Sequence, residues 1–376
     1  MGQRINTRLR AGGNVSGAVF DFMTGGLDPR ISIARASSAW HYNSAGNLVE
    51  VGSDVPRFDY DPVTLAARGL LTEGARTNIA LHSRDFTQTA WVKTNITAAL
   101  NVTGITGVTN SASRLTATAG NGTALQTITS ASATHVSSFS ARRITGTGTV
   151  EITQDNGALW TAITLTAAWQ RFVIPATTIT NPVIGFRIVT SGDVIAVDVA
   201  QCEVGTFATS PIITGAAAIT RAAETGTMPF VVPSEFSLLA ELVTTERVSG
   251  TGAATNQLVA ADDGTTNNVF ELQQRTTATP TSRLVTTIGG VGTALATSVL
   301  TLGAVHKHIG AYSGGNVAYC ANGGAVATQS GLTLPALNRI RFAAFGSGGA
   351  NSITYLRRIV IYPTSLSNSV LQALTA

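Results

Sequence analysis

Charged residues are scarce in this sequence, and their scarcity excludes several classes of protein. Only 12% of the 376 residues are Asp, Glu, Lys or Arg, about half the share found in an average soluble domain. Intrinsic disorder goes with low hydrophobicity and high net charge, whereas this chain is 44% hydrophobic and has a formal net charge of +4. The shortage of Lys and Glu also argues against long helices, which draw heavily on those residues.

Long apolar runs, cysteine clusters and targeting signals are missing as well. No segment approaches the roughly 18 consecutive apolar residues that cross a bilayer, so we expect no membrane insertion. Cys202 and Cys320 are too few and too far apart for a disulfide framework or a zinc site. The first residues lack the apolar stretch of a signal peptide, and Asn6 stands where myristoylation requires Ser or Thr. We therefore expect synthesis in a cytoplasm without export or anchoring.

Basic residues are not concentrated in the way that nucleic-acid binding requires. Of the 24, only Lys93 and Lys307 are lysines, and the arginines are spread along the whole chain. A nucleic-acid binder normally gathers its charge in a patch or stripe. The densest group, Arg4, Arg8 and Arg10, is more typical of a solvated tail than of a phosphate-binding arm. We expect no nucleic-acid partner.

Residues that favour sheets and tight turns are abundant instead. The chain has 55 Thr and 38 Gly, but only 23 Phe, Trp and Tyr together. β-Branched residues favour pleated sheets, and glycine favours the turns that join strands. The composition therefore predicts an all-β protein.

Runs of alternating apolar residues indicate how the chain is divided. Short strands at regular spacing predict an antiparallel jelly-roll sandwich over 81–210, and the pattern resumes as a second sandwich over 228–376. Small residues predict a linker over 211–227. Apolar residues at 366, 370, 371 and 374 share one helical face. They predict a short C-terminal helix with Ser367 as its N-cap.

Residues 1–80 are the most charged part of the chain. Their pattern predicts a hairpin of 39–42 and 48–51 around a Gly-containing loop. These strands are too few to close a core by themselves. We expect an attachment and oligomerisation module that docks on a partner or intertwines between copies. The alternative is a lobe that packs on the protein's own first sandwich.

Several segments resemble virion proteins of tailed phages. Arg35–Trp40 with Asn47–Val49, and Val55–Pro62 with Arg68–Asn78, resemble the N-terminal module of head-spike and tail-fibre proteins, which also occurs in prophages and gene-transfer agents. Ser83–Trp91 and Gln201–Pro211 are similar to the opening and closing of the carbohydrate-binding-type sandwich that follows it. The segment from Ile359 onward resembles the end of concanavalin A-like (laminin-G-type) sandwiches, although Asn368 and Ser369 replace the acidic pair common there.

The resemblance implies a component of a phage-like particle, made in a bacterial host and displayed on the virion surface. Residues 1–80 would attach to other capsid or tail proteins, and the protein would be a homo-oligomer. The leading functional hypothesis is a spike or fibre adhesin that binds host cell-surface polysaccharide. The alternative is a capsid or tail decoration protein without glycan binding.

Patterns that carry catalysis are missing. A phosphate loop needs Gly followed by Lys and Ser or Thr, but Val precedes Lys93 and His precedes Lys307. The Glu-x-Asp-x-x-Glu strand of concanavalin A-like glucanases and the Gly-x-Ser-x-Gly elbow of serine hydrolases do not occur. We therefore expect no catalytic residues, no enzymatic activity and no cofactor.

Two places in the sequence could begin a metal site. His306 and His308 are two residues apart and share one face of a strand, but no third ligand is near. Asp262 and Asp263 begin a loop whose oxygens suit calcium, and an ordinary Asp-Gly turn accounts for the same residues. We expect no metal, and Asp262 and Asp263 are the candidates for calcium.

Sugar recognition needs an aromatic face against sugar C–H bonds and polar groups for the hydroxyls. Trp91 and Trp169 lie in apolar contexts and are expected in the core. Arg187 projects opposite its apolar neighbours, and two tyrosines bracket Gly314 and Gly315. The candidate glycan-binding residues are therefore Trp160, Asn156, Asp155, Arg187, Tyr312 and Tyr319. A core position for Trp160 is an equal alternative.

Overall fold

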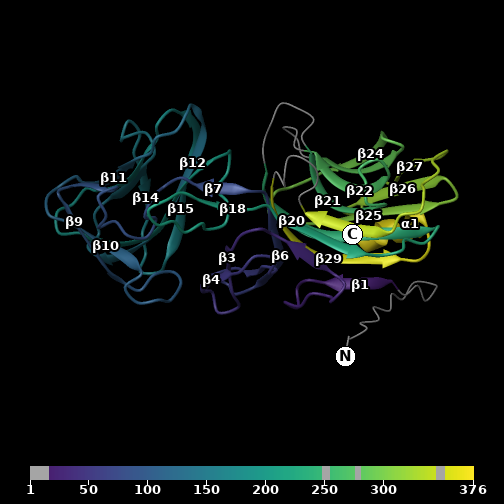
Figure 1. Ribbon diagram of the computed structural model, residues 1–376, viewed down its shortest axis with the longest axis horizontal. Coiled ribbons are helices and arrows are strands. Elements are labelled where there is room, and N and C mark those ends of the chain that lie inside the picture. Colours follow the sequence, from purple (N-terminus) through teal and green to yellow (C-terminus); the bar gives the residue numbers. More distant parts are fainter. Residues whose placement is uncertain (1–16, 248–254, 276–280, 344–351) are drawn as a thin grey trace. The chain divides into compact units, whose positions relative to one another are not determined.

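The computed structural model describes residues 17–247, 255–275, 281–343 and 352–376, and these form two compact units (Figure 1). Unit 1 comprises the described parts of Met1–Ala36, Ser53–Ala75 and Ala223–Ala376, and unit 2 comprises Ser37–Gly52 and Arg76–Ala222. Nearly all regular structure within these ranges is antiparallel sheet, with one helix of eight residues. The predicted all-β fold is confirmed. The Arg4, Arg8 and Arg10 cluster lies outside the described residues.

Unit 1 is a sandwich of two large sheets. The strands of its first sheet, in spatial order, are β27 (Ala327–Gln329), β26 (Asn316–Ala321), β25 (Val305–Ser313), β20 (Phe236–Arg247), β29 (Ser352–Tyr362), β6 (Ala67–Glu73) and β5 (Phe58–Tyr60), and β1 (Ala18–Asp21) also pairs with β29. The strands of its second sheet are β2 (Ser32–Ala34), β19 (Thr225–Pro229), β28 (Arg339–Ala343), β21 (Thr255–Asp262), β22 (Val269–Arg275), β23 (Thr281–Ile288) and β24 (Val291–Val299).

Alternating side chains close the core between these two sheets. Leu238 and Ile359 from the first sheet and Phe270 and Phe342 from the second are at most 2% exposed in one cluster. The other face of the first sheet is covered by helix α1 (Asn368–Thr375), whose Leu371 is fully buried. The predicted C-terminal helix is therefore confirmed.

Strands from the first 80 residues are built into this sandwich. β1 and β6 both pair with β29, and β2 pairs with β19. In Figure 1 the purple β1 lies beside the yellow β29. Residues 37–52 belong to unit 2 instead. The two units therefore do not divide at the expected boundary of residue 80. The reason is that β1, β2 and β6 pair with strands from later in the chain. Attachment to a particle through residues 1–80 stays a prediction.

Unit 2 is a second, smaller sandwich. One sheet has the order β15 (Gln170–Ile179), β12 (Ala133–Thr145), β17 (Val194–Val204), β10 (Ala112–Ala117) and β9 (Ile96–Val102). The other has the order β14 (Thr161–Ile163), β13 (Val150–Thr153), β16 (Val183–Ile188), β11 (Gly122–Thr127) and β8 (Val92–Thr94). Two small ribbons complete the unit: β3 (Ala39–Tyr42) with β4 (Leu48–Val51), and β7 (Arg76–Asn78) with β18 (Ile219–Arg221).

Two sequence predictions for unit 2 are confirmed. β3 and β4 form the expected hairpin. Trp91 is 1% exposed and stacks on Phe86, with ring centroids 3.8 Å apart. Cys202 also lies in this core as a free thiol, and burial raises its pKa to about 12. A buried free cysteine of this kind packs as a small hydrophobe.

The segment predicted as a linker divides between the two units. Ile212 is 3% exposed, and its backbone carbonyl and amide bond the side chains of Asn78 and Gln201, respectively. Further on, β18 pairs within unit 2, β19 pairs within unit 1, and the units part between residues 222 and 223. Small residues are typical of a linker. In the structure, however, side chains of residues distant in sequence form hydrogen bonds with the backbone of this segment.

Lys93 occupies a cage of backbone carbonyls in unit 2. Its ammonium donates to the carbonyls of Phe86, Thr87, Gln88 and Trp91 at 2.7–3.2 Å. Burial lowers the pKa of this amine. An ammonium is compact and its donors rotate toward surrounding oxygens, whereas a guanidinium is larger and holds its donors in one plane. This geometry explains a lysine at this position in a chain whose basic residues, apart from Lys93 and Lys307, are arginines.

We predict that Lys93→Ala lowers the free energy of unfolding of unit 2 by about 1–3 kcal/mol, because carbonyls lose their donor. Ammonium or potassium ions should restore part of the loss, whereas Lys93→Arg should not. Thermal melts followed by tryptophan fluorescence measure the effect. Asn101→Ala, which removes an exposed side chain of β9 in the same unit, is the control. Equal melts for Lys93→Ala and wild type would contradict the cage.

No helix in the described part of the chain is long and apolar enough to cross a membrane.

Candidate functional site

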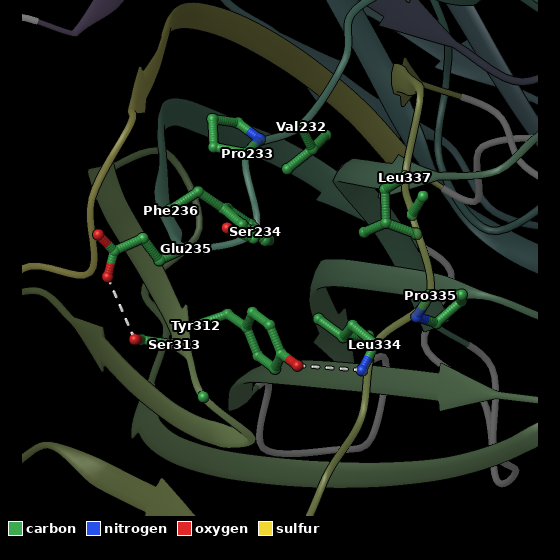
Figure 2. Close-up of a pocket in the computed structure, with 12 residues that line it drawn as sticks. Val232, Pro233, Ser234, Glu235, Phe236, Tyr312, Ser313, Leu334, Pro335 and Leu337 are labelled. Atoms are coloured by element: carbon green, nitrogen blue, oxygen red, sulfur yellow. Dashed lines mark hydrogen bonds between the residues drawn. The ribbon is translucent and has the colours of Figure 1, made fainter.

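An open cavity of about 590 Å³ lies at one end of the unit 1 sandwich (Figure 2). It is walled by the start of β20 with the residues before it, by the end of β25, and by the segment 334–337. Tyr312 lies among these residues, between Glu235 with Ser313 on one side and Leu334 with Pro335 on the other. One predicted glycan-binding residue therefore lines a cavity.

Strand register places Tyr312 in this wall. It pairs with Phe236 across β25 and β20, and Phe236 packs edge-on against Phe270 in the core. The Tyr312 hydroxyl accepts a hydrogen bond from the Leu334 amide at 3.1 Å and donates to the Leu332 carbonyl at 3.4 Å. These bonds hold the segment after residue 331 against the end of the sheet. The aromatic wall is thus fixed before any ligand arrives.

The polar side of the cavity is formed by Glu235, Ser234 and Ser313. The Glu235 carboxylate accepts a hydrogen bond from the Ser313 hydroxyl at 3.2 Å, and both Glu235 and Ser234 are exposed. A carboxylate has capacity for further donors beyond this one. The cavity therefore combines apolar walls with an acceptor for hydroxyl groups, as recognition of a sugar requires.

The other aromatic candidate, Trp160, lies in unit 2 beside a tight turn. The sequence Asp155-Asn156-Gly157 indicates a two-residue hairpin turn. Asn156 and Gly157 have the φ of such a turn, 61° and 78°, and β13 pairs with β14, but seven residues, 154–160, connect the two strands. The Asp155 carboxylate accepts hydrogen bonds from the Thr153 hydroxyl and the Leu159 amide. Asp155 is thus occupied in stabilising the turn.

Arg187 already covers Trp160. Its guanidinium carbon lies 4.5 Å from the indole centroid, and its Nε forms an ion pair with Glu151. The register places Arg187 between Glu151 and Thr123 on the exposed face of the β13–β16–β11 sheet. A sugar could stack on this indole face only by displacing the guanidinium, at the expense of a cation–π contact. Glycan binding by Trp160 and Arg187 stays a prediction, and the Tyr312 cavity is the better-formed site.

Tyr319 lies in the core of unit 1. It is 0% exposed, and its hydroxyl lies 2.8 Å from Nδ1 of His308. Burial, together with the charge of His306, lowers the pKa of His308 to about 3, so this imidazole is neutral. Tyr319 therefore has no surface for a sugar and does not join Tyr312. No group of three potential metal-ligating residues occurs in the described part of the chain.

Each carboxylate of the calcium candidate has a protein partner. Asp262 is 0% exposed and forms ion pairs with Arg339 and Arg341 at 2.7 and 2.9 Å. Asp263 accepts hydrogen bonds from Thr265 and Asn268, which lower its pKa to about 2. Two guanidinium groups oppose a cation at Asp262. Asp262 and Asp263 therefore fit an Asp-Gly turn rather than a calcium site.

Sequence reasoning missed the residues that surround Tyr312. Glu235 directly precedes β20, and Ser313 is the last residue of β25, 78 positions further along the chain. The adjacent Pro233 and Pro335 are ordinary turn signals. The pairing of β20 with β25 could have revealed these neighbours. It places Tyr312 opposite Phe236, and Glu235 directly precedes Phe236.

No family model and no curated protein matches the sequence. Similar solved structures include a Ruminococcus gnavus IT-sialidase CBM40 bound to α2,3 sialyllactose, 16% identical over 39% of this chain and 84% of that one, with a TM-score of 0.31. A heptameric SAP-like pentraxin from Limulus polyphemus is 14% identical over 40% and 72%, with a TM-score of 0.31. The binding domain of botulinum neurotoxin serotype D is 12% identical over 40% of each chain, with a TM-score of 0.32. These scores assign neither a ligand nor a site to this chain.

Proposed function

We propose that this protein is a glycan-binding adhesin and that the Tyr312 cavity of unit 1 takes a sugar of a host cell-surface polysaccharide. The observation that carries the proposal is the lining of the cavity, which combines Tyr312, Pro233 and Pro335 with a carboxylate and two serine hydroxyls. Apolar rings accommodate the C–H faces of a sugar, and Glu235 accepts hydrogen bonds from its hydroxyls. Glu235 is the one acid among the described residues of the lining, whereas glycoside hydrolysis uses two carboxyl groups.

We further propose that the protein is displayed as a spike or fibre on a phage-like particle. The support is the resemblance of the blocks within 35–91 to head-spike and tail-fibre proteins. Many weak sites on one particle then act together, which raises avidity without new contacts. Detection of this chain in purified particles by mass spectrometry tests the proposal, and its absence from them would overturn it.

We predict that Glu235→Ala weakens glycan binding about tenfold or more, because hydrogen bonds to a charged group contribute about 1.5–3 kcal/mol each. Glu235 is exposed, so the melting temperature without ligand should change little. The measurement is the rise in melting temperature of the protein with added host polysaccharide.

Glu50→Ala is the matched control for this experiment. Glu50 is an exposed carboxylate of β4 in unit 2, far from the cavity in sequence. It should leave binding unchanged. If polysaccharide fails to raise the melting temperature of the wild type, glycan binding is excluded and the decoration-protein alternative takes its place. If Glu235→Ala binds like the wild type, the sugar lies elsewhere.

A further inference from the structure

A second cavity of about 370 Å³ lies in unit 1, and it differs chemically from the first. Its polar wall comprises amides and hydroxyls, those of Asn316, Thr328, Gln329, Ser330, Ser365 and Asn368. No charged side chain lines it among the residues that the structure describes. Within the described residues, the side chains of Gln329 and Asn368 form no hydrogen bond to the protein. Amides and hydroxyls both donate and accept, so this wall matches the hydroxyls of an uncharged sugar.

The two cavities lie on either side of one hairpin. Tyr312, Ser313 and Gly314 of the β25–β26 hairpin line the Tyr312 cavity, and the second cavity begins at Asn316 of the same hairpin. Gly314 and Gly315 form its tip with φ of 53° and 83°. A Cβ at Gly314 would meet no atom within 4 Å. Gly314 is therefore open to anything that passes around the tip, whereas the Leu332 backbone packs against Gly315.

Two other chain segments also connect the cavities. Residues 328–330 line the second cavity and 334–337 line the first, and the Leu332 amide between them donates to the Gly315 carbonyl at 3.0 Å. Phe236 lines the first cavity, and the hydroxyl of the next residue, Ser237, accepts a hydrogen bond from the Leu366 amide of the second at 3.0 Å. Two segments, the β25–β26 hairpin and residues 328–337, thus line both cavities, and the Ser237–Leu366 hydrogen bond joins a third wall of each.

We infer that the two cavities are adjacent subsites for one extended, uncharged polysaccharide chain that passes around the Gly314–Gly315 tip. This inference rests on the proposed function and specifies its ligand. Of the described residues that line the two cavities, only Glu235 is charged. A sugar carboxylate would meet this like charge with no cation in the lining to balance it. Neutral glycans bind, and uronate- or sialate-containing glycans do not.

A glycan array tests the inference, with neutral oligosaccharides of one to eight units printed beside uronate- and sialate-containing ones. The wild type should bind neutral chains, with apparent affinity rising at least tenfold from the shortest bound chain to the longest. The double variant Gln329→Ala/Asn368→Ala should lose this rise while still binding the shortest chain. Glu235→Ala should weaken chains of every length. The replaced amides make no internal hydrogen bond, so the double variant should fold, as its melting temperature will show.

Asn101→Ala, which removes an exposed amide of β9 in unit 2, is the control and should match the wild type. Binding that is independent of length, or a double variant with the wild-type length profile, would overturn the paired subsites and leave the proposed function intact. Preference for acidic glycans would overturn the ligand class. Absence of binding to every glycan by the wild type would overturn the proposed function itself, and this inference with it.

Discussion

Replacing Glu224 by alanine should lower the free energy of unfolding of unit 1 by about 3–5 kcal/mol, because it leaves two buried guanidinium groups short of a counter-charge. The Glu224 carboxylate accepts hydrogen bonds from Arg35 at 2.8 Å, from Arg57 at 2.5 and 2.7 Å, and from the Glu73 amide at 3.1 Å. Arg57 also forms an ion pair with Glu73, and these four side chains are at most 3% exposed. Burial opposes the charge of Arg57, but the two carboxylates outweigh it and raise its pKa.

Arg30→Ala is the matched control within unit 1. Arg30 pairs with Asp28 at 2.9 Å, but its side chain is 54% exposed. Exposed ion pairs typically contribute between about 0 and 1 kcal/mol. Hydrogen exchange of β20 and β29 amides reports the stability of unit 1. Similar exchange in Glu224→Ala and Arg30→Ala would contradict a stabilising role for the buried network.

The second large effect is expected at Gly185, in the centre of a unit 2 sheet. Its φ is 153°, and a Cβ there would lie 2.0 Å from the Ala124 carbonyl oxygen of the neighbouring strand. β16 pairs with both β11 and β13 at this residue. The strands therefore cannot move apart without breaking a ladder. Gly185→Ala should lower the free energy of unfolding of unit 2 by about 3 kcal/mol or more, from overpacking and backbone strain together.

Tryptophan fluorescence measures this loss selectively, because all four tryptophans, at 40, 91, 160 and 169, belong to unit 2. Gly215→Ala is the control, since a Cβ there would meet nothing within 4 Å. Its stability should stay within about 0.5 kcal/mol of the wild type. A denaturant midpoint for Gly185→Ala equal to that of Gly215→Ala would show that the β11–β16 pair adapts without cost.

The candidate site could be predicted in part. Tyr312 was found as an aromatic beside a glycine turn, and Trp160 was found beside an Asn-Gly turn that the structure has. Tyr319 follows the same turn as Tyr312, but strand pairing places it opposite Gly310, beside His308, in the core. Sequence periodicity tells which face of a strand a side chain takes. It does not tell whether that face meets solvent or a second sheet.

Local patterns in the sequence by themselves determined the all-β fold, the β3–β4 and β13–β14 hairpins and the C-terminal helix, because each depends on residues a few positions apart. Tertiary structure alone decided which distant segments meet. Arg35 bonds Glu224 across 189 positions, and Glu235 bonds Ser313 across 78. Antiparallel strands from both ends of the chain share one sheet in unit 1, and their register is set by packing of the whole core. The buried network and the cavity beside Tyr312 both arise from that pairing.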